Sequence, residues 1–446
     1  MTDKAETQDS GGRFKDFFIL WSGQVLSLFG SGLTGFAVGV WVYESRGSVT
    51  DFTLIFAFGA VPGLLIGPFV GVLIDEWSRR WVLVLTDAVA ALGTVALIGL
   101  LTLDRLELWH IYAIVMVGAS AMSVHRPAYQ STVTLLLPKK HFARASGMLQ
   151  FGQSASQVLA PLAAGFLLPL VSLGGIVAID LVTFLVAMAT LVAIAIPKVE
   201  RAPAPGPRRS IFAQAAVGWT YIRERPALVS LVLFFAMVNL LFAFSLVLTT
   251  PLVLSFAGPR ELGVVLATGS VGALVGSLAM SLWGGLKKPI YGILGFSPVL
   301  GLAYLVVGAR PSLVTVTAGV FLLFLAVPVI NASNHAIWQS KVDPKVQGRV
   351  FAVSQLVSQF TAPVAFVAAG PLADLLFEPM LAPGGALAGS VGRFIGVGAG
   401  RGIAFQFLVM GLLLLTVTGG ALLYPRLRRL EDEVPDAVPE EASAVV

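Results

Sequence analysis

Apolar stretches of twenty or more residues recur along the whole chain, and this feature limits its fold more than any other. A helix needs about 20 residues to cross the hydrocarbon core of a bilayer. Inside lipid every backbone N–H and C=O needs a partner within the protein, so only helices and closed barrels can span. Unbroken runs such as Leu181–Ile196 and Phe407–Leu423 favour helices, because barrel strands alternate apolar and polar residues. The sequence therefore predicts an all-α membrane protein.

The amino-acid composition supports this fold class and excludes others. Hydrophobic residues make up 57% of the chain and charged residues 12%, whereas a soluble domain carries about 25% charged residues. The chain contains no cysteine, which excludes a disulfide framework, thiol chemistry and zinc–cysteine sites. A net charge of +5 would be compatible with nucleic-acid binding, but the distribution of the basic residues indicates membrane topology instead.

The apolar stretches predict twelve helices in two sets of six. We expect them at about 17–43, 51–74, 81–102, 109–136, 145–169, 173–196, 228–256, 261–285, 288–308, 312–338, 349–377 and 403–424. The predicted organisation is an N-terminal half at 1–196, a linker at 197–227, a C-terminal half at 228–425 and an acidic, disordered tail at 426–446. The linker is rich in proline and carries six Lys and Arg, and its segment Ile211–Ile222 is expected to lie flat at the membrane surface.

Basic residues predict the orientation in the membrane. With a cytosolic N-terminus, 22 of the 29 Lys and Arg fall in cytosolic segments, six fall in outer loops, and Arg126 lies within a helix. This bias follows the positive-inside rule. The polar start Met1–Gly12 lacks the apolar core of a signal peptide, so the first helix is expected to be retained. We therefore predict a multi-pass protein of the cytoplasmic membrane with both termini in the cytosol.

An internal repeat supports the division into two halves. The pattern Gln-x-x-Ser-Gln-x-x-Ala-Pro occurs at 153–161 and again at 355–363, in the fifth predicted helix of each half. Upstream, Tyr129-Gln130-Ser131 matches Trp338-Gln339-Ser340. Matches in the same order indicate two six-helix halves related by a parallel repeat.

Three local motifs connect the chain to a known family. The segment 71–80, Gly-Val-Leu-Ile-Asp-Glu-Trp-Ser-Arg-Arg, resembles the signature loop of the major facilitator superfamily, with departures at Glu76 and Ser78. The segment from Ser156 through Ala160-Pro161 to Ala164-Gly165 resembles a motif of its proton-coupled exporters. Residues 125–131, with 179–180 and 183–184, are similar to the branch that holds macrolide-efflux and enterobactin-exporter proteins. The resemblance implies the major facilitator fold, with twelve helices in two halves related by a pseudo-two-fold axis.

The resemblance also implies positions for a conformational gate. Asp75, followed by Arg79 and Arg80, would sit against the N-terminus of the eleventh helix, where the helix dipole stabilises an anion by about 0.3–1 kcal/mol. The alternative is a solvated helix end whose charges only set topology. Pro161 and Gly165 would allow a close helix contact that seals the outer gate. Helix packing without a gating role explains these two residues equally well.

Polar residues in the predicted membrane core indicate a substrate cavity. Arg126 lies about 16 Å from the cytosolic end of its helix, and an unpaired arginine there costs about 2.5–3.5 kcal/mol. The repeat places His335 at the equivalent position of the second half. In the family, helices 1, 4, 7 and 10 line the cavity, which adds further lining candidates: Gln130, Asn239, Asn331, Asn334 and Trp338. The alternative is structural, with Arg126 paired to Asp87 and His335 bonded to a backbone carbonyl.

Candidates for proton coupling are His335, Asp87 and Asp180. Histidine changes charge near neutral pH and is therefore suited to coupling, whereas Asp180 has the alternative interpretation of a cap on the sixth helix. Asp374 and Glu378 lie near the outer end of the eleventh helix. The glycine-rich stretch Gly396–Gly402 has no preceding strand and no Lys-Ser/Thr, so nucleotide binding is not expected. We predict no cofactor, no metal site and no enzymatic activity.

The expected function is secondary active efflux, by alternating access, of amphipathic small molecules such as drugs, siderophores or peptide natural products. The missing nucleotide-binding loop indicates that an ion gradient supplies the energy. Export and proton antiport are what the resemblance implies. Expected partners are the substrate, protons and the lipid bilayer, with no nucleic acid, and the protein is expected to be a monomer. Two alternatives stay open: a solute–proton symporter, which would have a more polar cavity, and a membrane sensor that transports nothing.

Overall fold

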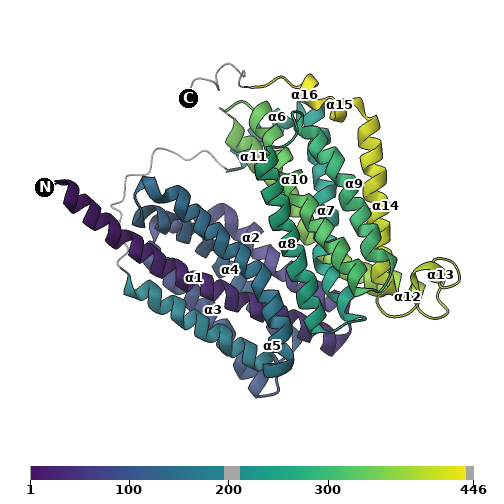
Figure 1. Ribbon diagram of the computed structural model, residues 1–446, viewed down its shortest axis with the longest axis horizontal. Coiled ribbons are helices and arrows are strands. Elements are labelled where there is room, and N and C mark those ends of the chain that lie inside the picture. The colour runs from purple at the N-terminus through teal and green to yellow at the C-terminus, as the bar shows by residue number, and fades with distance from the viewer. Residues whose placement is uncertain (1, 195–210, 345, 438–446) are drawn as a thin grey trace. The chain divides into compact units, whose positions relative to one another are not determined.

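The computed structural model describes residues 2–194, 211–344 and 346–437, and within them the side chains of 2–13, 68–69, 71–76, 211–215 and 359 are not described. All regular secondary structure in these residues is helical (Figure 1). Eleven helices in the described part are long and apolar enough to cross a membrane. The described chain forms two compact units, and each is treated by itself. The predicted all-α membrane fold is confirmed.

Unit 1 comprises the described residues of Met1–Gly47, Leu54–Ala204 and Pro259–Ala267. Its helices are α1 (Thr2–Arg46), α2 (Val49–Glu76), α3 (Arg79–Thr102), α4 (Leu108–Leu136), the short η1 (Lys139–His141) and α5 (Phe142–Ala193). α1 packs along α5, and α3 packs against both α4 and α5. Fully buried apolar side chains hold these four helices together, among them Phe17, Leu20, Leu83 and Leu191.

A break within α5 explains why eleven spans occur where twelve helices are predicted. α5 has 52 residues, so an unbroken helix of this length would measure about 78 Å, far more than one crossing requires. Ser172 has φ 58° and ψ 177°, a conformation outside the helical region, shortly after Pro169. Each side of this kink is long enough for a crossing of its own. The predicted fifth and sixth helices therefore both lie within α5, one on each side of a sharp bend at Ser172.

Unit 2 comprises the described residues of Ser48–Thr53, Pro205–Gly258 and Thr268–Val446. Its helices are α6 (Ile211–Arg223), α7 (Pro226–Leu254), α8 (Pro259–Trp283), α9 (Pro289–Ala309), α10 (Leu313–Lys341), α11 (Gln347–Pro371), η2 (Leu372–Phe377), α12 (Glu378–Leu381), α13 (Gly392–Ile395), α14 (Arg401–Leu423), α15 (Pro425–Arg428) and α16 (Leu430–Glu433). α9 packs against α10 and α14, and α7 packs against α11 and α14. α6 is formed by the segment that was expected to lie at the membrane surface. It packs on α11, and Gly218 of α6 lies against the backbone of Arg349.

Two helices begin in one unit and continue in the other. Ser48 and the start of α2, as far as Thr53, belong to unit 2, and the start of α8, Pro259–Ala267, belongs to unit 1. Within unit 1, α8 approaches α5 so closely that a Cβ on Gly165 would lie 2.6 Å from the carbonyl oxygen of Pro259. Within unit 2, a Cβ on Gly370 would collide with the backbone of Thr50. Glycine permits both close approaches because it has no side chain.

The C-terminal segment differs from the disordered tail predicted from residue 426. α15 and α16 lie at the same end of unit 2 as α6 (Figure 1). Lys341, 5% exposed, donates to the carbonyl of Glu431 at 2.8 Å and pairs with Asp436 at 2.9 Å. The backbone N–H of Ala437 donates to Ser340. These bonds order the chain as far as Ala437, and they were not foreseen because composition alone does not reveal a buried lysine as their partner.

Candidate functional site

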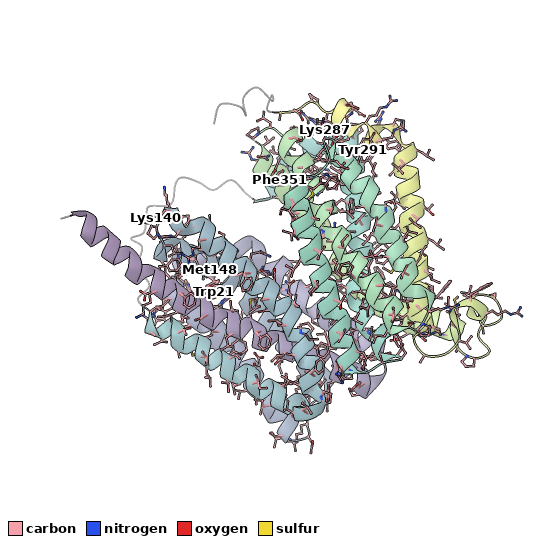
Figure 2. All side chains as sticks on the ribbon, in the orientation of Figure 1. Trp21, Lys140, Met148, Lys287, Tyr291 and Phe351 are labelled. Atoms are coloured by element: carbon pink, nitrogen blue, oxygen red, sulfur yellow. The ribbon has the colours of Figure 1, made fainter. Side chains whose placement is uncertain are left out.

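Unit 1 contains a cavity of about 300 Å³, which we call the unit 1 pocket. Aromatic, aliphatic and polar side chains from α1, α3, α4 and α5 line it, among them Trp21, Gln24, Ser31, Asp87, Met122, His125, Arg126, Tyr129, Gln130, Gln153 and Phe184. The indole of Trp21 donates to the carbonyl of Met148 at 2.9 Å, which joins α1 to α5 beside the pocket (Figure 2). A mostly apolar cavity with a few convergent polar groups is typical of a ligand site.

A hydrogen-bonded cluster forms the most buried polar part of the pocket. Asp87 on α3 and His125 on α4 are 5% and 7% exposed. Oδ1 of Asp87 lies 3.2 Å from Nδ1 of His125. Gln24 on α1 contacts both residues, at 3.2 Å to Asp87 Oδ2 and 3.1 Å to His125 Nε2. The hydroxyl of Thr86 lies 2.9 Å from His125 Nδ1. A buried charge needs such partners, because desolvation without them is costly.

Arg126 and Gln130 also line the pocket, and both side chains are exposed. The structural alternative for Arg126, a pair with Asp87, is not what the structure contains, since Asp87 pairs with His125. The physical reason lies in helix geometry, because adjacent residues on a helix point about 100° apart. His125 faces α3, and Arg126 is directed to the open part of the pocket. An exposed arginine in this position is available to a ligand.

Asp180 lies near the pocket rather than at a helix start. It is 2% exposed on α5, and its Oδ1 lies 3.5 Å from the hydroxyl of Ser31 on α1. A Cβ on Gly30 would lie 2.8 Å from the same oxygen, so Gly30 allows α1 to approach the carboxylate. The alternative of a cap on the sixth helix is wrong, since the helix resumes directly after Ser172 and Asp180 lies two turns further on.

The candidate cavity residues of the C-terminal half lie on α7 and α10 in unit 2. Asn239 donates to the carbonyl of Phe235 in its own helix at 2.8 Å. The side chains of Asn334 and Trp338 are only 5% and 3% exposed. The indole N–H of Trp338 donates to Asn334 Oδ1 at 3.2 Å. Two further candidates on α10 have exposed side chains: Asn331 and His335. Exposed positions suit ligand contact, whereas Asn334 and Trp338 satisfy each other.

The gate candidates are only partly described. Asp75 lies in the last turn of α2, but its side chain is among those not described. Arg79 and Arg80 begin α3. Arg80 donates from Nη2 to the carbonyl of Val192 at 2.9 Å, at the C-terminal end of α5. The last carbonyls of a helix have no intrahelical donor and attract cations, so Arg80 caps α5 within unit 1.

Pro161 and Gly165 form the contact with the first turns of α8. A Cβ on Gly263 would lie 2.6 Å from the carbonyl oxygen of Pro161 and 3.3 Å from Gly165 Cα. Arg260, at the start of α8, lies over the ring of Phe166 at 4.5 Å from its centroid. Backbone therefore packs on backbone at this position, as expected from the small residues around Pro161.

Most residues of the pocket were not among the sequence-based candidates, and the most important of these are Gln24 and His125. His125 directly precedes Arg126, which attracted attention because arginine is the costlier residue in lipid. The available signal was the presence of an amide, a carboxylate and an imidazole in three predicted helices of the same half. Among the described residues, no three His, Asp or Glu side chains converge as ligands for a metal ion.

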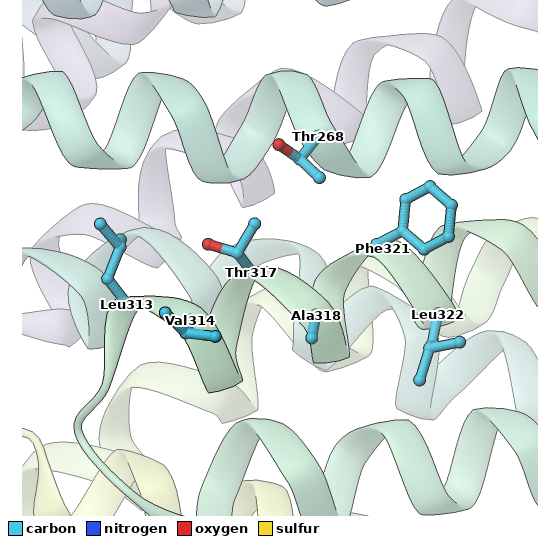
Figure 3. Close-up of a pocket in the computed structure, with 7 residues that line it drawn as sticks. All are labelled: Thr268, Leu313, Val314, Thr317, Ala318, Phe321 and Leu322. Carbon is cyan, nitrogen blue, oxygen red and sulfur yellow. The ribbon is translucent and has the colours of Figure 1, made fainter.

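A second hollow has a different character. A groove of about 570 Å³ between α8 and α10 is lined by Thr268, Leu313, Val314, Thr317, Ala318, Phe321 and Leu322 (Figure 3). Val314 is 77% exposed, and the two threonine hydroxyls are the polar groups of this lining. Both helices are candidate membrane spans, and an apolar groove between such helices suits contact with lipid chains. We assign no functional site to it.

Comparison with known families decides the identity of the fold. The family model described as Major Facilitator Superfamily matches residues 20–366. The chain belongs to the major facilitator superfamily. Its members are transporters rather than enzymes, which agrees with the pocket and the membrane-spanning helices described above.

Within the superfamily, the chain is similar to efflux proteins. It is 25% identical over 377 residues to Macrolide efflux protein A of Streptococcus pyogenes, covering 80% of this chain and 89% of that protein. It is also 25% identical over 416 residues to the Multidrug efflux pump Tap of Mycolicibacterium fortuitum, covering 90% and 94%. The expected resemblance to the macrolide-efflux branch is confirmed.

Solved structures of the superfamily share the fold. A bacterial homologue of the human lysosomal transporter Spinster, in an inward-facing and unoccupied conformation, matches with a TM-score of 0.69 at 15% identity, covering 96% of this chain and 99% of that one. The nucleoside transporter NupG matches with a TM-score of 0.68 at 11% identity, covering 92% and 99%. At these identities the likeness concerns the fold alone.

Proposed function

We propose that this protein is a secondary active exporter that couples the outward movement of amphipathic small molecules to the inward movement of protons. The observation that carries the proposal is the unit 1 pocket, where aromatic and aliphatic walls surround a few buried polar groups. The efflux activity named for two relatives supports export. Fold alone does not determine direction or substrate.

The pocket supports amphipathic substrates through its composition. Trp21, Met122 and Phe184 offer apolar and aromatic surface, while Arg126 and Gln130 offer polar contacts. Its volume of about 300 Å³ is at the lower end of ordinary ligand pockets, which hold about 300–1,000 Å³. It therefore suits a small amphipathic molecule or one end of a larger one. The cavity candidates on α7 and α10, His335 among them, belong to unit 2 and remain candidates for substrate contact there.

Transport requires an energy source and alternation of access. The sequence contains no nucleotide-binding loop, so an ion gradient is the expected source. The candidates for proton coupling remain Asp87, Asp180 and His335. The gate hypothesis for Asp75 rests on the signature loop, and that for Pro161 and Gly165 gains support from their backbone contact with α8. Such contacts can break and re-form as helices move.

Proteoliposomes with an imposed pH gradient test the proposal. The purified protein would be reconstituted and offered a panel of macrolides, cationic dyes, siderophores and small peptides. We expect at least one compound to move against its gradient when protons flow in the opposite direction, and not after an ionophore collapses the pH gradient. Movement with the protons would instead identify a symporter. No movement of any panel member, in protein that binds none of them, would favour a sensor.

A further inference from the structure

Three side chains from three helices form a closed ring of contacts in the wall of the unit 1 pocket. Gln24 Nε2 lies 3.2 Å from Asp87 Oδ2, Asp87 Oδ1 lies 3.2 Å from His125 Nδ1, and His125 Nε2 lies 3.1 Å from Gln24 Oε1. Asp87 and His125 are nearly inaccessible to solvent. The two contacts of Gln24 are hydrogen bonds, whereas the approach of Asp87 Oδ1 to His125 Nδ1 is an ion-pair distance.

An ionised aspartate and a neutral histidine leave the contact between Asp87 and His125 electrostatically unfavourable. When Gln24 donates to Asp87, its oxygen faces His125 Nε2, which must then carry the hydrogen. A neutral imidazole has one N–H, so Nδ1 would present a lone pair to the carboxylate. If the amide of Gln24 is turned over, its oxygen faces Asp87 Oδ2 and the shortage moves to that contact. One additional proton removes the unfavourable contact in either orientation.

Thr86 identifies where this proton is best accommodated. Its hydroxyl lies within donating distance of the Val82 carbonyl at 2.9 Å, and its oxygen can then accept from His125 Nδ1 at the same distance. A doubly protonated His125 then donates to the Thr86 oxygen, and its positive charge lies 3.2 Å from the ionised Asp87 carboxylate, so that the pair has no net charge. Loss of the proton leaves the buried carboxylate of Asp87 beside a lone pair of a neutral imidazole, without a compensating charge, which is unfavourable.

We propose that Gln24, Asp87 and His125 are the proton-binding site of this transporter, with a single exchangeable proton held between Asp87 and His125. On release the proton passes to water in the pocket, His125 becomes neutral and Asp87 keeps its charge. The ring then loses one contact and holds α1, α3 and α4 together less firmly. Because Trp21 and Arg126 line the same pocket, proton release changes the surface offered to substrate. The use of this site in transport rests on the proposed function, whereas proton binding itself does not.

Other titratable groups act on this ring. Arg126 and Tyr129 line the pocket from α4, and Asp180 on α5 contacts Ser31, which lines it from α1. Among the described lining residues Arg126 is the permanent cation, and its charge favours the release of a proton from its neighbour His125. The carboxylate of Asp180 has the opposite charge to Arg126 and therefore favours retention of the proton on His125. The ring is therefore placed between groups that act on its proton in opposite directions.

Histidine NMR tests the proton site without any substrate. The chain has four histidines, so purified protein labelled at histidine gives few signals, and His125→Gln identifies the signal of interest. We expect His125 to gain or lose one proton at Nδ1, while Nε2 keeps its hydrogen, between about pH 5 and pH 8, where histidine ordinarily changes charge. In Asp87→Asn the amide completes the ring around a neutral imidazole, so this titration should disappear. Asp104→Asn, in an exposed turn, serves as the matched control and should leave it unchanged.

Transport measurements connect the site to coupling. With a macrolide as probe, Asp87→Asn should lose at least tenfold of the accumulation driven by a pH gradient, whereas Asp104→Asn should accumulate the probe at the wild-type level. Gradient-driven accumulation at the wild-type level in Asp87→Asn would overturn the proposal. So would a wild-type His125 that shows no titration across the range, a result that does not depend on the folding of any variant. If His125 titrates as described but the wild type transports no compound, the proton site stands and the proposed function falls.

Discussion

The carboxylate of Asp374 caps the first turn of α2 by accepting the backbone N–H of Thr50 at 2.8 Å. It also accepts the N–H of Val49 at 3.1 Å and the hydroxyl of Ser48 at 2.9 Å. The first N–H groups of a helix have no partner within it, and the helix dipole favours an anion there. Glu378 does the same for α14, where it accepts the N–H of Ile403 at 3.1 Å. Both carboxylates, which follow the C-terminal end of α11, therefore act as helix caps.

Replacing Asp374 by alanine should destabilise unit 2. Loss of a helix cap costs about 0.5–2 kcal/mol, and two backbone N–H groups lose their acceptor. The measurement is thermal unfolding of the detergent-purified protein, read as the loss of monodisperse protein with temperature. Asp374→Asn is the matched control. It keeps one acceptor oxygen, so it should lose less thermal stability than Asp374→Ala. An alanine variant as stable as the wild type would show that α2 does not depend on this cap.

Replacing Gly165 by alanine should destabilise the contact between α5 and α8. The new Cβ would lie 2.6 Å from the carbonyl of Pro259 and 3.2 Å from Gly263 Cα, and overpacking costs about 1–3 kcal/mol. Gly147→Ala in the same helix is the control, since a Cβ there meets nothing within 4 Å. In the same thermal-unfolding assay, Gly165→Ala should be clearly less stable than the wild type, and Gly147→Ala should be as stable as the wild type. Equal stability of the two variants would contradict the close approach.

Glu431 should make the docking of the C-terminal segment sensitive to pH. Its Oε1 accepts the N–H of Ile290 at 2.9 Å, while its buried Oε2 has no partner among the described residues. Burial raises the pKa of Glu431 above its ordinary value, and the Ile290 N–H opposes this rise. The docked segment therefore holds the proton more tightly than the free one. Docking is favoured at low pH and weakens as the pH rises through the raised pKa.

Glu431→Gln tests this pH dependence, because the amide keeps an acceptor for Ile290 and does not ionise. Limited proteolysis of the C-terminal segment across the acidic range measures docking. Wild-type protein should become easier to cleave as the pH rises, whereas the variant should be cleaved at a rate that changes little. If the cleavage rates of the two proteins changed with pH in the same way, Glu431 would not be the cause of the pH dependence. The exposed pair of Lys288 and Asp432, 2.7 Å apart, is present in both.

Arg126→Ala should weaken the binding of substrates with anionic or strongly polar groups. A hydrogen bond to a charged group contributes about 1.5–3 kcal/mol, which corresponds to roughly 10- to 100-fold in affinity. The measurement is equilibrium binding to purified protein, with Arg105→Ala in the exposed turn after α3 as control. Since Arg126 is exposed in the pocket, the variant should fold. Unchanged affinity would show that Arg126 does not contact substrate.

Membrane topology is accessible because the chain has no native cysteine. Single cysteines at Glu224, after α6, and at Ser390, between α12 and α13, should label from opposite sides of oriented vesicles. The prediction follows from the bias of 22 cytosolic to six outer basic residues. Glu224→Cys should react with an impermeant reagent from the cytosolic side and Ser390→Cys from the outer side. Labelling of both from the same side would contradict the orientation.

Much of the architecture followed from local properties of the sequence. Long apolar runs define membrane helices whatever their neighbours are, because lipid leaves the backbone no other partners. The same local logic identified the superfamily signature and the small residues around Pro161. It also directed attention to Arg126 and Asp87, since polar residues in apolar helices are costly wherever they point.

Only the tertiary structure decided which polar residues meet. Asp87 pairs with His125 rather than Arg126, because helix rotation decides which of two adjacent side chains faces α3. The buried position of Lys341 orders a C-terminal segment whose composition indicated disorder. Ser172 bends α5 through a backbone conformation that its residue type does not reveal. In each case the deciding contact joins residues far apart in sequence or depends on an angle, and periodicity along one helix does not contain that information.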